Sequence, residues 1–259
     1  MDPKIVVKGI HMEYYPLQGK LTALEGIDLE IYRGEFLCIL GPSGCGKSTF
    51  LRLVAGLLKP SSGEITILRD GQSPFLATLV FQEYALFPWR SVLDNVAFGL
   101  EMHGQPKTKR YEVAQRFIEK VGLREFSHAF PHQLSGGMKQ RVGIARAFAS
   151  DPEILLMDEP FGALDAQTRT ILQDELIQIW EESRKTVIYV THSIDESIYL
   201  GDRIVLMTSR PGKIKEIFAV DLSRPRKIEM KGWPLYSELS LKIWGSLKEE
   251  VERSSIGDG

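Results

Sequence analysis

The sequence has little cysteine, no long apolar run and almost no excess of charge. Cys38 and Cys45 are the only cysteines among 259 residues, which gives no disulfide framework and favours a reducing compartment. Lysine and arginine number 32 against 34 aspartates and glutamates, and this balance gives no general case for nucleic-acid binding. No run approaches the roughly 20 apolar residues that cross a bilayer. No signal-peptide pattern opens the chain, so we expect a cytoplasmic protein.

Glycines and hydroxyls gather in one segment between the apolar runs 36–40 and 50–55. The segment consists of Gly41, Pro42, Ser43, Gly44, Cys45, Gly46, Lys47, Ser48 and Thr49. A buried strand, a glycine-rich turn and a helix are the context in which this pattern cradles phosphate. Backbone N–H groups can point at the anion, Lys47 adds a charge for the outer phosphates, and the Ser48 hydroxyl is placed to ligate magnesium. A plain glycine turn would need neither the lysine nor the hydroxyls, so we predict a nucleotide site.

Strand and helix patterns predict two lobes. Alternating residues predict half-exposed antiparallel strands over 4–15 and 26–31 and a short strand over 64–68. Short apolar runs at 36–40, 79–81, 154–157 and 186–191 alternate with helical patterns, which predicts a parallel α/β core. Helix formers dominate residues 85–151, where helices are expected over 91–101 and 109–121. A hairpin is expected over 204–220, and a helix over 239–251 before a frayed end from 254.

The predicted fold is therefore α/β, a P-loop core with a parallel sheet, an N-terminal antiparallel β subdomain and an inserted helical lobe. We assign residues 1–84 and 152–225 to the nucleotide-binding core with its antiparallel subdomain. Residues 85–151 form the helical lobe, and residues 226–259 form a C-terminal helical tail.

Asp158 and Glu159 follow the apolar run 154–157 without a break. In a phosphoryl-transfer site, Asp158 can hold magnesium together with Ser48, and Glu159 can orient or deprotonate the attacking water. Two helix-capping carboxylates are the alternative, and the phosphate loop argues against it because magnesium needs a carboxylate in reach. Gln82 stands at the carboxyl end of the strand predicted over 79–81, where ligands of open α/β sheets bind. Without the phosphate loop, a surface glutamine would be the preferred interpretation.

A second anion site is suggested by Ser135, Gly136 and Gly137, which precede a predicted helix ending near Ala149. A capping serine followed by two glycines exposes backbone N–H groups at a helix start, where the helix dipole favours negative charge. A flexible turn explains the same composition equally well, so the residues alone leave the two interpretations open.

Residues 134–141, which read LSGGMKQR, resemble the signature of ABC-family ATPases and stand in the family's chain order between the phosphate loop and Asp158. The resemblance covers nearly the whole chain. It implies that Gln82 is the Q-loop glutamine, that residues 161–165 form the D-loop, and that His192 is the switch histidine. Tyr14 stands where members carry the aromatic that stacks on adenine, with Tyr15 as the alternative.

The resemblance further implies that two copies pair head to tail, each ATP lying between one chain's Lys47 loop and the other chain's residues 135–137. Gln82 would then tie magnesium to the helical lobe, and His192 would contact the γ-phosphate. The implied catalytic residues are Glu159, His192 and Gln82, and the implied magnesium ligands are Ser48, Gln82 and Asp158. The implied nucleotide-binding residues are Tyr14, residues 41–49, Ser135, Gly136, Gly137 and Asp165.

Within the family, residues 82–89 and 210–212 and the methionine at 138 are similar to the ATPases of nitrate, sulfonate, taurine and bicarbonate importers. This implies a peripheral subunit on the cytoplasmic face of the plasma membrane, working with permease subunits and indirectly with a solute-binding protein. We expect Phe87 and Trp89 to be exposed in the groove that receives the permease. Two departures from the family pattern are Met138, in place of glutamine, and Ser193, where many members have aspartate.

Two alternatives belong to other classes of protein. An ABC ATPase of a soluble assembly, such as iron–sulfur cluster biogenesis or chromosome maintenance, shares the motifs, although the latter would need a long coiled-coil insertion that this sequence lacks. A nucleotide or metabolite kinase shares only the phosphate loop and would leave residues 135–137 without a role.

Overall fold

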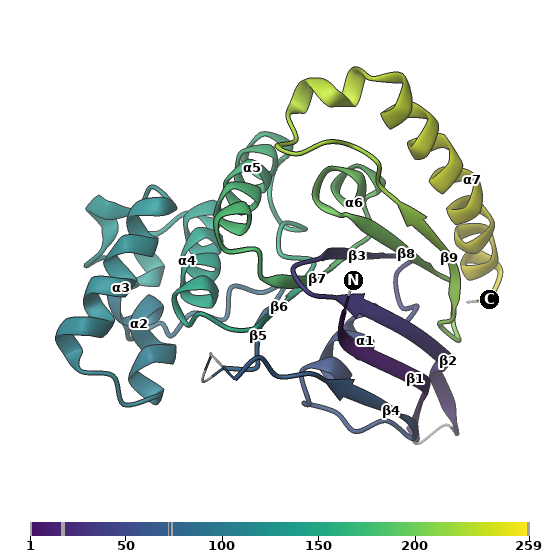
Figure 1. Cartoon of the computed structure of the whole chain (residues 1–259), viewed down its shortest axis with the longest axis horizontal. Coiled ribbons are helices and arrows are strands. Elements are labelled where there is room, and N and C mark those ends of the chain that lie inside the picture. Colours follow the sequence, from purple (N-terminus) through teal and green to yellow (C-terminus); the bar gives the residue numbers. More distant parts are fainter. Residues whose placement is uncertain (1, 17–18, 72, 74, 258–259) are drawn as a thin grey trace. The chain divides into compact units, whose positions relative to one another are not determined.

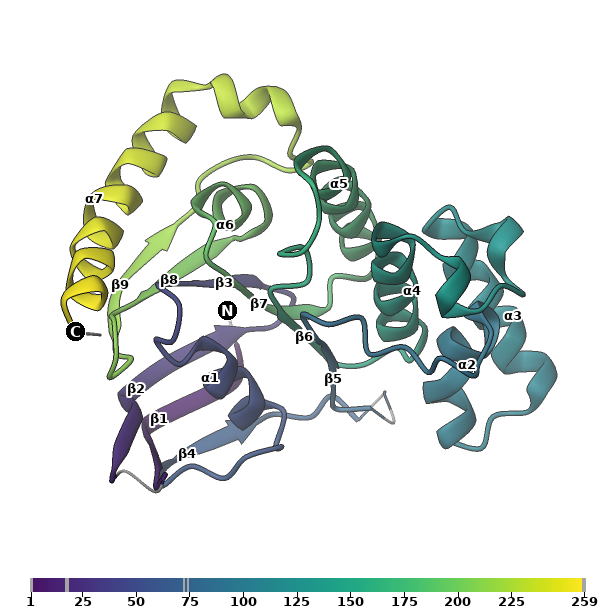
Figure 2. The ribbon, with the colours of Figure 1, turned by 180° about the vertical axis from the view of Figure 1, so that it is seen from behind.

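The computed structural model describes residues 2–16, 19–71, 73 and 75–257. It divides into two compact units, of which the first combines Met1–Arg69 with Thr186–Gly259 and the second is Asp70–Lys185. Figure 1 shows the elements of both units along the chain, and Figure 2 shows them from behind. The domain borders expected at residues 84/85, 151/152 and 225/226 stay predictions.

The first unit contains two groups of strands. Its elements are β1 (Pro3–Tyr14), β2 (Leu21–Tyr32), β3 (Phe36–Leu40), α1 (Lys47–Val54), β4 (Ser62–Ile67), β7 (Thr186–Thr191), α6 (Ile194–Leu200), β8 (Arg203–Met207), β9 (Ile214–Ala219), the 3-10 helix η3 (Ile228–Gly232) and α7 (Pro234–Gly257). Strands β2, β1 and β4 form an antiparallel sheet in that order. Alternate residues such as Ile5, Val7 and Ile10 are buried there, so the predicted antiparallel subdomain is confirmed.

The parallel strands of the first unit carry the phosphate loop. Strand β3 pairs in parallel with β7 and with β8, and β9 is antiparallel to β8. Every residue of β3 and β7 is buried, as expected of parallel strands covered on both faces. Leu40 lies opposite Thr191 in the register, so Gly41 and His192 follow neighbouring strands at the same edge of the sheet. The strand pairing thus brings two predicted site segments together from distant parts of the sequence.

The second unit contains a two-stranded parallel ladder and helices. Its elements are β5 (Ala77–Val80), α2 (Val92–Met102), α3 (Lys107–Lys120), the 3-10 helices η1 (Arg124–Phe126) and η2 (Pro131–Gln133), α4 (Gly136–Ala149), β6 (Ile154–Asp158) and α5 (Ala166–Ser183). Strand β5 pairs in parallel with β6, with Val80 opposite Met157. Helices α2, α3 and α4 pack side by side (Figures 1 and 2), so the helical character predicted for residues 85–151 is confirmed.

Three sequence-based predictions need correction, and one helix is missing from the predicted elements. Strand β5 ends at Val80, and Phe81 beyond it is exposed, because the apolar run continues past the strand. Helix α6 was not predicted, although Ser193 followed by Glu196 is a helix-start signature. Helix α7 runs over Pro234–Gly257 and not 239–251, because its buried side chains begin at Tyr236. It therefore continues through residues 254–257, where a frayed end was expected; residues 258–259 lie outside the described part.

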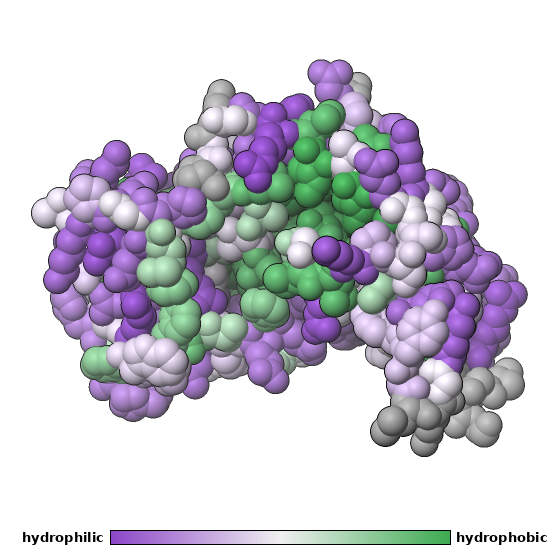
Figure 3. Space-filling view, turned by 90° about the horizontal axis from the view of Figure 1, so that it is seen from below, coloured by the Kyte–Doolittle hydropathy of each residue, from purple (hydrophilic) through white to green (hydrophobic). Residues whose placement is uncertain are grey.

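Hydrophobic side chains are distributed unevenly over the surface. On the face shown in Figure 3, hydrophobic residues gather toward the middle of the view, and hydrophilic ones cover much of its margin.

Among the helices that the structure describes, none combines the length and the hydropathy that crossing a bilayer requires.

Candidate functional site

The phosphate loop of the first unit is built as the sequence predicts. It leaves β3 at Leu40 and enters α1 at Lys47, and its backbone takes left-handed angles at Gly44 and Gly46, with φ of +74° and +101°. A Cβ atom at Gly46 would lie 2.6 Å from Leu24 Cδ2, so the position has neither the conformation nor the space for a side chain. None of the described side chains caps the start of α1 by a hydrogen bond. The first N–H groups of the helix are therefore oriented for an anion.

Lys47 lies inside the curve of this loop. Its side chain is buried, and its ammonium donates to the carbonyl oxygens of Gly41 at 2.8 Å and Pro42 at 2.9 Å. A buried ammonium surrounded by main-chain oxygens is a charge that phosphate oxygens can pair with directly. Ser48, one residue further, is half-buried at the helix start. The donor set of the loop fits a nucleoside triphosphate.

Tyr14 and Tyr15 lie at the end of β1 and differ in their surroundings. The Tyr14 hydroxyl lies 3.4 Å from Thr49 Oγ1, which places this half-buried ring beside the phosphate loop. Tyr15 is 75% exposed and donates to Glu13 Oε2 at 2.8 Å. Of the two tyrosines, the structure brings Tyr14 to the loop.

His192 follows β7 and is exposed. The turn behind it is fixed by Ser193, whose backbone N–H donates to Thr191 Oγ1 at 3.0 Å and whose hydroxyl accepts from the Glu196 backbone N–H at 3.3 Å. The serine thereby caps α6, a role that aspartate fills equally well. The departure from the family pattern at this position therefore keeps the cap.

In the second unit, the strand pairing places Gln82 and the two carboxylates at one edge. Gln82 follows β5, and Asp158 and Glu159 end or follow the neighbouring β6. Glu159 takes a left-handed backbone conformation with φ of +45°, which is uncommon for a residue with a side chain and occurs often at active sites. Asp158 and Glu159 are both half-buried. The arrangement places an amide and two carboxylates at one edge of the paired strands.

Magnesium usually takes one or two carboxylates and completes its shell with substrate phosphate oxygens and water. In the second unit, Asp158 and Gln82 carry oxygens of the kind that such a shell uses; in the first unit, taken by itself, Ser48 carries a hydroxyl oxygen. Across residues 2–16, 19–71, 73 and 75–257, no group of three or more histidine, cysteine, aspartate or glutamate side chains forms a cage for a metal by itself. Each of these oxygens is of a kind that a magnesium shell accepts.

Ser135, Gly136 and Gly137 form the start of α4. Ser135 is the N-cap, and its hydroxyl accepts a hydrogen bond from the Met138 backbone N–H at 3.3 Å. Met138 takes part in this cap through its main chain and not through its side chain. Ser135 is exposed and the two glycines are half-buried. The predicted second anion site is therefore an accessible helix start with a capping serine.

Asp165 caps α5. Its carboxylate accepts from the backbone N–H groups of Thr168 at 3.0 Å and Gln167 at 3.1 Å. The hydrogen bond from Thr168 is the main cause that lowers the pKa of Asp165 below its usual value. Asp165 therefore stays ionised and holds the turn of residues 161–165 against the helix.

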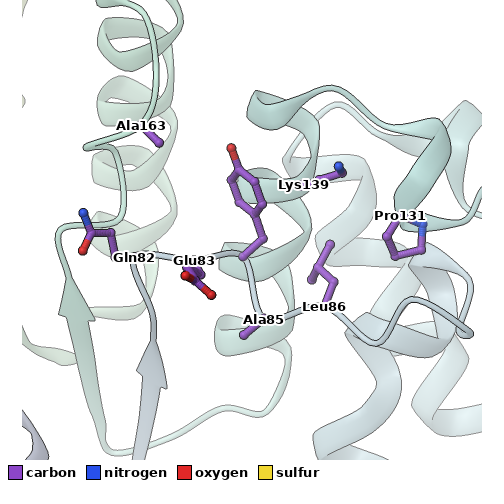
Figure 4. Close-up of a pocket in the computed structure, with 8 residues that line it drawn as sticks. Gln82, Glu83, Ala85, Leu86, Pro131, Lys139 and Ala163 are labelled. Carbon is purple, nitrogen blue, oxygen red and sulfur yellow. The ribbon is translucent and has the colours of Figure 1, made fainter.

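A hollow of about 650 Å³ opens in the second unit, lined by residues 82–86 with Pro131, Lys139 and Ala163 (Figure 4). Figure 4 shows Gln82 beside the end of its strand and Lys139 on the opposite side. The Lys139 ammonium lies 5.9 Å from the centre of the Tyr84 ring, and a Cβ atom at Gly136 would lie 2.7 Å from the Tyr84 hydroxyl. Tyr84 therefore contacts the start of α4. No pattern in the sequence predicts this contact.

Next to this hollow, residues 84–90 present an aromatic surface. Trp89 is 71% exposed, whereas Phe87 is half-buried because it packs on Phe98, with ring centres 4.5 Å apart. The expectation of an exposed Phe87 is thus wrong, and that of an exposed Trp89 is confirmed. Buried Asn95 holds the turn by bonding the N–H and carbonyl of Phe87 and the carbonyl of Arg90.

An apolar groove of about 330 Å³ adjoins this turn. Its lining includes Phe81, Phe87, Phe98 and Met102, with Arg146 at one side. Arg146 donates to the carbonyl of Ala85 at 2.8 Å, and its burial lowers the pKa of its guanidinium. The groove is therefore mainly apolar, with one arginine in its lining.

Known proteins resemble this chain over most of its length. A family described as "ABC transporter" matches residues 24–162. An uncharacterized ABC transporter ATP-binding protein of Methanocaldococcus jannaschii is 54% identical, over 98% of this chain and 95% of that protein. The nitrate import ATP-binding protein NrtD of Synechocystis is 42% identical, over 91% of this chain and 93% of that protein. The bicarbonate transport ATP-binding protein CmpC of Synechococcus elongatus is 47% identical over 88% of this chain, which spans only 36% of that protein.

Two solved structures have the same fold. A dimeric bacterial ABC transporter cassette superposes with a TM-score of 0.74 at 34% identity, covering 85% of this chain and all of that one. The same cassette in a dimeric post-hydrolysis state with ADP and phosphate superposes with a TM-score of 0.74 at 33% identity. The match again covers 85% of this chain and all of that one.

Proposed function

Because the chain belongs to the ABC transporter family, as an ATP-binding and ATP-hydrolysing subunit with the cassette fold, we propose that it drives the import of a small polar solute. The candidate solutes are nitrate, bicarbonate, taurine or a related sulfonate. The observation that carries the proposal is the 42% identity to a nitrate import ATP-binding protein, which extends over 93% of that protein. The 47% identity to a bicarbonate transport ATP-binding protein supports the same branch.

We propose the following roles for the residues described above. The Lys47 loop binds the ATP phosphates, and Tyr14 stacks on the adenine. Glu159 orients or deprotonates the attacking water, and His192 contacts the γ-phosphate. Ser48, Asp158 and Gln82 hold magnesium, which when bound neutralises charge on the phosphates.

The positions of the proposed catalytic groups support these roles. Glu159 has an uncommon backbone conformation at a strand end. Such a conformation is expected where a carboxylate must be oriented toward a reacting water. His192 follows the strand next to the one that leads into the phosphate loop. Because the Lys47 ammonium is fixed by two carbonyl oxygens, its charge is already in place and little ordering is needed on binding.

The working unit that we propose is a head-to-tail pair of copies. The related cassette at 34% identity is dimeric, which supports a homodimer. In the proposed pair, the Lys47 loop of one copy and residues 135–137 of the other complete one ATP site, and Asp165 holds the adjoining turn. One chain would then offer two anion sites because each serves a different nucleotide.

The proposed partners are integral membrane permease subunits, fed by a solute-binding protein. The groove beside Phe87 and the exposed Trp89 supply an apolar surface for a helix of the permease. On this proposal the chain is peripheral and lies on the cytoplasmic face of the plasma membrane. It never touches the solute, whose recognition belongs to the other subunits.

Co-expression with candidate permease subunits tests this function. A tag on this chain should recover the permease in detergent, and the reconstituted complex should hydrolyse ATP faster when the loaded solute-binding protein is added. Recovery of the chain with a soluble assembly and no membrane protein would contradict the importer and favour a cytosolic ABC ATPase.

A further inference from the structure

The turn between β8 and β9 packs directly against the phosphate loop. Gly212 in this turn donates its N–H to the Ala23 carbonyl and accepts from the Glu25 N–H, both at 3.0 Å. A Cβ atom at Gly212 would lie only 2.0 Å from the carbonyl oxygen of Cys45, so the two backbones touch with no room for a side chain. The turn is thereby fixed between β2 and the phosphate loop within the first unit.

Arg210, two residues earlier, bonds the phosphate loop itself. Its Nε and Nη2 atoms donate to the Gly44 carbonyl oxygen at 3.4 and 3.3 Å. In a trans peptide the carbonyl and the next N–H point in opposite directions. Holding the Gly44 carbonyl outward therefore directs the Cys45 N–H inward, where it donates to the Pro42 carbonyl at 3.4 Å. The Pro42 carbonyl also accepts from the Lys47 ammonium at 2.9 Å. The Cys45 N–H and the lysine proposed to bind phosphate therefore meet at the same carbonyl inside the loop.

The guanidinium has an electrostatic effect in addition to the geometric one. A cation on a carbonyl polarises the peptide and makes the following N–H a stronger donor, and it adds positive potential beside an anion site. Because Arg210 is exposed, solvent screens part of this potential. The orientation of the peptide is then the larger contribution.

The C-terminal helix α7 holds the other side of the turn. Glu250 is almost fully buried and accepts from the backbone N–H of Ser209 at 2.9 Å and from its hydroxyl at 3.2 Å. Lys215 of β9 donates to the same carboxylate at 2.8 Å. Burial alone would raise the pKa of Glu250, but the bonds from Lys215 and Ser209 outweigh it and lower that pKa. Glu250 therefore stays ionised and fixes the residue next to Arg210.

We propose that Arg210 is a positioning residue for the phosphate loop and that Glu250 of α7 holds Arg210 in place. The C-terminal helix thus acts on the nucleotide site through one continuous path, Glu250 to Ser209, Arg210 and Gly44. The inference rests on the proposed role of the Lys47 loop as the ATP site. It gives the C-terminal tail a function in nucleotide affinity.

The test compares Arg210→Gln with Lys213→Gln. Both substitutions remove one cation from the same turn, but Lys213 pairs only with Glu25 among the described ion pairs, at 3.2 Å and half exposed. ATP dissociation constants, KM, kcat and thermal unfolding are measured for both and for the wild type. For Arg210→Gln we expect the dissociation constant and KM to rise roughly three- to tenfold, as when one hydrogen bond is lost. The kcat should stay within about twofold and the unfolding temperature should be unchanged, because Arg210 is exposed.

Rescue and coupling variants complete the test. Arg210→Lys keeps a donor and should recover part of the affinity, which a simple packing defect would not allow. Glu250→Gln should weaken ATP binding in the same direction, and the double variant Glu250→Gln/Arg210→Gln should bind no more weakly than Arg210→Gln alone. Additive effects would overturn the path from Glu250.

Equal ATP affinities of Arg210→Gln and Lys213→Gln would overturn the inference while leaving the proposed function intact, provided that the wild type binds ATP and Lys47→Ala binds it at least about tenfold more weakly. If the wild type does not bind ATP, the proposed function and the inference fail together. The two failures are therefore distinguishable from one set of titrations.

Discussion

The amide of Gln82 and the carboxylate of Glu159 approach the same point above Gly162. A Cβ atom built at Gly162 would lie 3.7 Å from Gln82 Nε2 and 3.8 Å from Glu159 Oε2. The two side chains come from the neighbouring strands β5 and β6, and both strands end at this edge. The roles proposed for Gln82 on magnesium and for Glu159 on water require the two side chains to be neighbours in a phosphoryl-transfer site.

Glu159→Gln should slow ATP hydrolysis by about 10²- to 10⁴-fold and leave ATP affinity intact. The reason is that the amide keeps the shape of the side chain but cannot take a proton from water. Single-turnover hydrolysis and nucleotide titration measure the two effects separately. Glu112→Gln, an exposed carboxylate of α3, is the control and should hydrolyse ATP at the wild-type rate. Turnover of Glu159→Gln near the wild-type rate would remove Glu159 from the mechanism.

Lys47→Ala should weaken ATP binding by at least about tenfold, since charge-assisted hydrogen bonds to the outer phosphates are lost. Calorimetric titration with ATP measures the change. The matched control is Lys242→Ala, a lysine of α7 that is 64% exposed and pairs with Glu216 at 3.4 Å. An unchanged affinity of Lys47→Ala would refute the assignment of this loop to the nucleotide.

Sequence patterns were sufficient for the elements that carry the motifs. Strand β3, the loop after it and α1 could be predicted because apolar runs, glycines and a P-loop spacing are local signals. The candidate residues at strand ends could be chosen by the same reasoning, since parallel strands share one carboxyl edge.

Contacts between distant residues could not be predicted in the same way. The bond from Arg210 to Gly44 joins positions 166 residues apart, and it depends on the register of β8 and β9. The contact of Tyr84 with the start of α4 likewise depends on how a loop folds back. Helix α6 shows a different cause, because its seven residues are too short for a helical period to stand out.

Gly212→Ala should destabilise the protein by about 1–3 kcal/mol, because the new methyl group overlaps a main-chain oxygen that cannot move without displacing the phosphate loop. ATP affinity should fall as well. Gly245→Ala is the control, since nothing lies within 4 Å of a Cβ atom there and alanine favours an α-helix by up to about 1 kcal/mol. Chemical denaturation of the two variants should give changes of opposite sign. Equal stability of Gly212→Ala and wild type would show that the turn can move freely.

Trp89→Ala should leave folding and the ATP affinity of the isolated chain unchanged, because the side chain is 71% exposed. It should weaken binding to the permease by roughly 30-fold or more, as for an aromatic hot spot. Trp233→Ala, at the end of η3 and 44% exposed, is the matched control. Affinity for the detergent-solubilised permease measures the difference, and equal binding by both variants would place the permease elsewhere.

The central claim is that two copies of the chain complete each ATP site together. Mixing two inactive variants tests this claim most directly. Lys47→Ala disables a chain's phosphate loop, and Ser135→Arg blocks its signature helix. A mixed dimer then holds one sound site, from the Ser135→Arg chain's loop and the Lys47→Ala chain's residues 135–137. Since about half of randomly formed dimers are mixed, the account predicts ATP hydrolysis up to about a quarter of the wild-type rate. Hydrolysis by the mixture no faster than by either variant alone would contradict it.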